Sequence, residues 1–119
     1  MNAATRTRRA TLRTRAAHTR TTRRAHRATN TGQPQPARTH LIAAGIPPTT
    51  AKRYAAAFSR GLTADAARTT KIKLKGRTRK TTQIKLYTAT TFAHRLATYR
   101  PRDITAARLF EQAAHRLAA

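Results

Sequence analysis

The side chains most able to bind a partner are the lysines and arginines of one short segment, KIKLKGRTRKTTQIKL, residues 71–86. Apolar and charged residues alternate on either side of Gly76, which is the period of two β-strands joined by a turn. The pattern predicts a hairpin over residues 71–87, with an apolar side on the core and a cationic side toward phosphates. The apolar side comprises Ile72, Leu74, Ile84 and Leu86. The expected phosphate contacts are Lys73, Lys75, Arg77, Arg79, Lys80 and Lys85.

A second set of arginines lies near the N-terminus, where residues 1–38 hold ten arginines and no acid. Burial of so few large apolar side chains cannot offset the entropy of ordering, so we expect this tail to be disordered when free. Six arginines are spaced 3, 4, 7, 4 and 3 residues apart, so they would share one face if a phosphate backbone induced a helix. These phosphate-binding candidates are Arg6, Arg9, Arg13, Arg20, Arg24 and Arg27.

The charge of the whole chain supports the same chemistry. Its 119 residues include 26 Lys and Arg against three acids, a formal net charge of +23. A field of this size attracts polyanions, and like charges on neighbouring strands repel unless a partner neutralises them. The expected partner is therefore a nucleic acid: double-stranded DNA first, structured RNA second.

A membrane partner is not expected. The longest largely apolar stretch, residues 41–46, is far too short to cross a bilayer, and Leu12 alone in the tail offers little to insert. The N-terminal arginines are not followed by the apolar run of a secretory signal, and they lack the apolar face of a mitochondrial presequence. The expected location is the cytoplasm, in association with the nucleoid.

The residue types give little reason to expect an enzyme. The three acids, Asp65, Asp103 and Glu111, are scattered, whereas a metal-dependent nuclease needs clustered carboxylates. The five histidines have no metal-ligand spacing, and the chain has no cysteine and no phosphate-binding glycine loop. We therefore expect no enzyme activity and no catalytic, cofactor or metal site.

The elements that would position these cations are mainly helices. Residues 1–38 are expected to be the tail together with its polar linker TGQPQP, residues 31–36, and residues 39–119 a basic domain. The expected fold is mostly α with one β-hairpin, a small helix-turn-helix or winged-helix-like domain. Its helices are expected at about 39–45, 48–60, 63–69, 91–99 and 103–118, on the hydrophobic periodicity.

Local signals set the helix ends. Pro48 suits the first position of a helix, where a missing N–H has no consequence. Asp65 is expected near the N-terminus of the 63–69 helix, Thr90 or Thr91 as the cap of the next, and Asp103 as the cap of the last.

Apolar stripes should hold these helices together. One helix face carries Ala51, Tyr54, Ala57 and Phe58, and another carries Phe92, Leu96 and Tyr99. The last helix has a seam of Ala106, Phe110, Ala113 and Leu117. Such a seam is usually core, but a homodimer interface stays open as an alternative.

LIAAGIPPTTAKRY, residues 41–54, resembles the core of the bacterial helix-turn-helix motif of DNA-binding proteins. The matching positions are Gly45, Ile46, Thr50, Ala51 and Arg53, while Leu41 and Pro47 depart from the usual small residue and Ser/Thr cap. The resemblance implies that the start of the second helix enters the major groove. The residues that it places there are Thr49, Thr50, Lys52 and Arg53.

A second alignment competes with the first. Residues 57–69 also have helix-turn-helix spacing, at Ala57, Gly61, Leu62 and Thr63. This alignment makes 64–70 the recognition helix and 71–87 a wing. We favour the first alignment, because the second puts Asp65 beside phosphates.

These observations together predict a small, highly basic DNA-binding protein of a bacterium, plasmid or phage. It would contact phosphates through tail and hairpin, and a helix would read bases if it regulates transcription rather than compacts DNA. The alternative is an RNA-binding structural component of a ribonucleoprotein, similar to a ribosomal protein with a basic extension.

Overall fold

The computed structural model describes residues 2–73, 75–76 and 79–118. Two phenylalanines lie at the centre of its helical core. Phe58 and Phe110 are fully buried, with ring centroids 6.2 Å apart, and Phe92 lies 5.4 Å from Phe58. The chain runs through α1 (Ala3–Asn30), α2 (Ala37–Ala43), α3 (Pro48–Ser59), β1 (Ala66–Lys73), β2 (Arg79–Leu86), α4 (Ala89–Thr98) and α5 (Ile104–Ala118). The described residues are thus mostly helical with one antiparallel hairpin, which confirms the predicted coarse class.

The apolar stripes expected from the sequence do form most of this core. Ala51 and Leu96 are fully buried, as the periodicity of their helices requires. In the seam of α5, Ala106, Phe110 and Ala113 are buried, whereas Leu117 is 46% exposed. Pro48 begins α3, and the carboxylate of Asp103 accepts the Ala106 N–H at 3.0 Å, as predicted for these helix starts.

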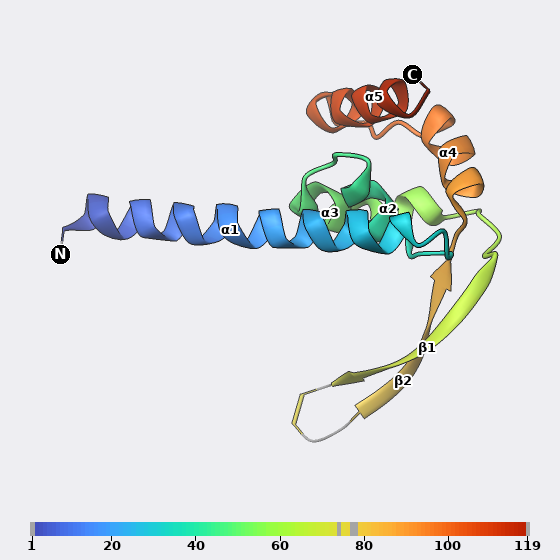
Figure 1. The fold of residues 1–119 in the computed structure, drawn as a ribbon, viewed down its shortest axis with the longest axis horizontal. Coiled ribbons are helices and arrows are strands. Elements are labelled where there is room, and N and C mark those ends of the chain that lie inside the picture. Colours follow the sequence, from blue (N-terminus) through green and yellow to red (C-terminus); the bar gives the residue numbers. More distant parts are fainter. Residues whose placement is uncertain (1, 74, 77–78, 119) are drawn as a thin grey trace.

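The N-terminal segment departs from the expectation, because a 28-residue helix, α1, stands where a disordered tail was predicted. Its C-terminal part packs on α2, and Ala25 is 4% exposed within the core. Asn2 caps the other end by accepting the Thr5 N–H at 2.9 Å. Figure 1 shows that the N-terminal half of α1 projects beyond the other helices.

The hairpin is longer than predicted, and the helix expected over 63–69 is wrong. The strands pair from Ala66 opposite Leu86 to Lys73 opposite Arg79. Pairing along this length satisfies the backbone of residues 66–70 by strand bonds, which outweighs the helical preference of its alanines. With strand residues at 66–70, the recognition helix and wing of the second alignment are not formed as predicted.

The hairpin is an arm and does not lie on the core. Figure 1 shows it leaving the helices and curving away from them. Ile72 is 47% exposed, and Ile84 and Leu86 are half-buried, so the prediction that the apolar side packs on the core is wrong. Leu74, also predicted to pack there, lies outside the described residues.

The base of the arm is firmly attached. Tyr87 is 3% exposed and exchanges two backbone hydrogen bonds with Gln35, at 2.8 and 3.0 Å. The Asp65 carboxylate accepts the backbone N–H of Thr88 at 2.9 Å. Thr88 itself caps α4, so neither the cap predicted at Thr90 or Thr91 nor the predicted place of Asp65 was correct.

Candidate nucleic-acid interface

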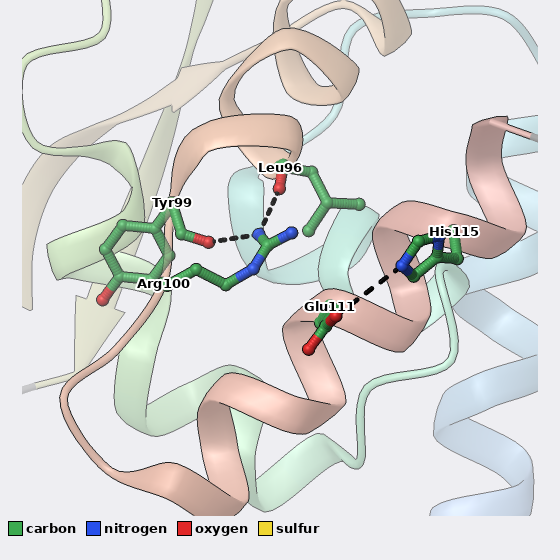
Figure 2. A network of polar contacts seen from close by, with 5 residues as sticks. All are labelled: Leu96, Tyr99, Arg100, Glu111 and His115. Carbon is green, nitrogen blue, oxygen red and sulfur yellow. Dashed lines mark hydrogen bonds and ion pairs between the residues drawn. The ribbon is translucent and has the colours of Figure 1, made fainter.

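Each of the three acids has a partner within the fold that is neither lysine nor arginine. The positive charge therefore stays largely unbalanced. Asp65 accepts hydrogen bonds from Thr88, and Asp103 caps α5. Glu111 lies 3.7 Å from the Nε2 atom of His115, one turn along α5, and both side chains are solvent-exposed (Figure 2). Hydrogen bonds from the Thr88 backbone, and then from the Thr91 side chain, lower the pKa of Asp65 below its ordinary value.

Several arginines of the helical core are bound to helix C-termini instead of carboxylates. The Nε of Arg95 donates to the carbonyl of Phe58 at 2.8 Å, and Nη2 of Arg116 donates to that of Ala44 at 3.1 Å. These carbonyls end α3 and α2, where the helix dipole favours a cation.

Arg100, which follows α4, does the same at the C-terminal end of that helix. Its Nη1 donates to the carbonyls of Leu96 and Tyr99 at 2.7 and 2.6 Å (Figure 2). Three arginines of the helical core thus have structural partners, whereas the predicted phosphate contacts lie on α1 and the hairpin.

All nine arginines of α1 are exposed. The six with regular spacing share a stripe that lies about 100–160° around the helix from Ala25, at about 100° per residue, and Arg24 at its edge also lines a pocket beside Ala25. The structure therefore brings together the predicted contacts Arg6, Arg9, Arg13, Arg20, Arg24 and Arg27. The shared face predicted for a helix bound to phosphate is already present in the protein alone.

The hairpin register divides its cations between two faces. Residues opposite each other project on the same side of an antiparallel pair. One side of the hairpin therefore carries Lys71, Lys73, Arg79 and Lys85. Lys80 pairs with Ile72 on the other side, so its predicted place on the cationic side is wrong. Lys75 is exposed near the turn, and Arg77 lies outside the described residues.

Two further hairpin cations were absent from the predicted contacts. Lys71 lies on the cationic side, and its alternation with Ile72 was a sufficient signal to include it. Arg68 is exposed on the other side of β1, in the segment predicted to form the 63–69 helix. The cationic surface of the arm thus extends further toward the core than the sequence indicated.

The start of α3 forms a third exposed group. Thr49, Lys52 and Arg53 are exposed and Thr50 is half-buried, while the opposite face of α3 packs in the core. The guanidinium of Arg53 lies 5.3 Å from the centre of the Tyr54 ring. A shallow cleft of about 200 Å³ separates this helix start from α5. Asp103 lines the cleft, which weakens the local attraction for phosphate.

The described residues contain no group of three or more His, Asp or Glu side chains that could hold a metal ion, and no helix there could span a membrane. Neither a protein-family model nor a curated protein nor a solved structure matches the chain.

Proposed function

We propose that the protein binds double-stranded DNA by neutralising phosphates with α1 and the β1–β2 hairpin. The observation that carries this proposal is the exposure of cations on two elements that project from the core. Neither element contains an acid. Because a solvated surface that serves only solubility mixes both signs of charge, acid-free projecting arms favour a polyanionic partner.

The burial of the aromatic rings favours double-stranded DNA over a single-stranded nucleic acid. Single strands are held largely by bases that stack on exposed aromatic rings. All six Tyr and Phe residues here are buried or half-buried. Structured RNA, with α1 as the basic extension of a ribonucleoprotein component, is the second candidate, because the same cations would bind its phosphates.

Binding should depend steeply on salt. If about 6–10 phosphates are neutralised, counterion release predicts that the affinity for a duplex falls by roughly 10³–10⁵ between 50 and 200 mM salt. The measurement is a titration of the full chain against a duplex of about 30 base pairs and against a folded RNA, at matched salt. A shallow salt dependence would contradict the proposal, and tighter binding to the RNA would select the second candidate.

Base reading by α3 is a separate proposal, taken from its resemblance to a recognition helix. Arg53→Ala should remove sequence discrimination with little effect on affinity for random duplex, since a base contact distinguishes sequences. Arg79→Ala, the matched control on the hairpin, should weaken binding to all duplexes alike. Selection of sequences from a random duplex pool by the full chain and both variants measures this. An equal, sequence-blind loss from both variants would exclude the role of α3.

A motif enriched by the full chain would favour transcription regulation, while binding without a motif would favour DNA compaction. Either role would place the protein with the nucleoid.

A further inference from the structure

The N-terminal half of α1, residues 3–16, has a neutral side and a cationic side. Every side chain in this range except Thr5 is exposed. The hydroxyls of Thr7, Thr11 and Thr14 each donate to the carbonyl four residues earlier at 3.0 Å, so they need no further partner. At about 100° per residue, these threonines continue the side of α1 on which Ala25 packs. The arginines occupy the remaining half of the helix surface.

An exposed leucine lies in the middle of the cationic side. Leu12 is 57% exposed. Arg8 and Arg15 lie roughly 40–60° to one side of it, and Arg9 and Arg13 roughly 60–100° to the other, at 100° per residue. Ala16 lies one turn further along the strip between the two rows. Two rows of guanidinium groups thus flank a narrow strip of small and apolar side chains.

We propose that this half of α1 inserts into the major groove of B-form DNA, with the strip around Leu12 against the base edges. This inference rests on the proposed function. The major groove is about 12 Å wide and admits an α-helix, and the phosphates of both strands border it, one for each arginine row. The strip suits the base edges because the methyl group of thymine lies in that groove and takes apolar contacts.

The shape of α1 suits this occupant. Residues 3–16 span about 20 Å, which is the length of roughly six base pairs. Because the other end of α1 is fixed in the core through Ala25, the helix is presented to the groove without a separate ordering step. The major groove of A-form RNA is too deep and narrow for such a helix, so the same geometry disfavours duplex RNA.

Two readouts on the full chain test the insertion. The first is protection from dimethyl sulfate, which methylates guanine N7 in the major groove and adenine N3 in the minor groove; N7 should be protected and N3 should not. The second compares a duplex with its copy in which deoxyuridine replaces thymine, which removes only the major-groove methyl group. Wild-type affinity should fall about four-fold on this exchange, the effect of losing one buried methyl contact.

Leu12→Ala assigns the methyl effect to this residue. The variant should bind thymine duplex about four-fold more weakly than wild type and no longer respond to the deoxyuridine exchange. Alanine favours a helix more than leucine, so helicity by circular dichroism should be retained. Leu117→Ala, at an exposed leucine near the end of α5, is the matched control and should keep the full response.

The outcomes separate the two proposals. N7 protection together with a methyl effect that Leu12→Ala abolishes would support insertion. Salt-dependent duplex binding with N7 unprotected and no methyl effect would overturn insertion and leave the proposed function standing, with α1 lying across the backbone. A lack of duplex binding, or a preference for folded RNA at matched salt, would overturn both.

Discussion

At the scale of single residues, His40 connects α2 to the base of the hairpin. Its side chain is buried, its ring is stacked on Phe92 at 4.9 Å, and Nε2 lies 2.7 Å from the carbonyl oxygen of Tyr87. Because the carbonyl can only accept, Nε2 carries the proton and donates it. Burial lowers the pKa of His40 below 6.5, and the hydrogen bond to Tyr87 opposes this only in part.

Because the fold favours the neutral form of His40, we expect the protein to be less stable in acid. The unfolded chain takes up a proton at His40 near pH 6.5, but the folded protein does so only at lower pH. Stability from the neutral ring is therefore complete above the unfolded pKa and is lost as pH falls from about 6.5 through the lowered folded pKa. The melting temperature should fall over this window, and His40→Gln should remove most of that dependence. An unchanged pH profile in the variant would contradict the prediction.

At the scale of the elements, carbonyl groups at helix ends take the place of carboxylates as partners for Arg95, Arg100 and Arg116. Arg95 belongs to α4 but donates to the end of α3, and its guanidinium lies 5.0 Å from the ring of Tyr99. It joins elements that the hairpin separates in sequence. The contact is structural, so its loss should affect stability more than the proposed affinity for DNA.

Arg95→Ala should lower the free energy of unfolding by about 1–3 kcal/mol, the usual contribution of a hydrogen bond from a charged group. Arg108→Ala removes an exposed arginine from α5 and should change it by less than about 0.5 kcal/mol. Urea denaturation measures both variants. Equal effects would contradict a special role for the contact between α4 and α3.

The elements also show which parts of the secondary structure the sequence patterns could predict. The periodicity of α3, α4 and α5 predicted these helices, because each buries a stripe whose spacing is local. The segment around Ala66 was assigned to a helix, because its preference is helical and its strand partner lies beyond a turn. Strand pairing is non-local, so a preference summed over neighbouring residues does not detect it.

At the scale of the whole molecule, positive charge is divided between the helical core and two projecting elements, α1 and the hairpin. Arg95, Arg100 and Arg116 of the helical core donate to carbonyl groups, while the arginines of α1 and the lysines of the hairpin are exposed on elements that project from that core. A net charge of +23 repels itself in the folded state more than in the expanded chain.

Salt should therefore stabilise the protein alone, whereas it should weaken the proposed binding to DNA. Screening of exposed charges is much stronger at 0.5 M than at 0.05 M salt. The melting temperature should rise by about 2–8 °C over this range, equivalent to roughly 0.5–1 kcal/mol for a small domain. Differential scanning calorimetry in sodium chloride measures it. A melting temperature that falls with salt would show that attractive charge contacts dominate.

The sequence by itself determined the excess of positive charge, the main helices of the core and the alternation within the hairpin, because each depends on residue type or short-range spacing. The helix starts at Pro48 and Asp103 were determined in the same way. Tertiary structure alone decided that the hairpin leaves the core and that Arg116 binds the carbonyl of Ala44, 72 residues away. It also decided that the C-terminal part of α1 joins the core, because Ala25 packs in an apolar site formed by segments that follow it in the chain. Composition contains no record of such a site, which exists only once those segments have packed.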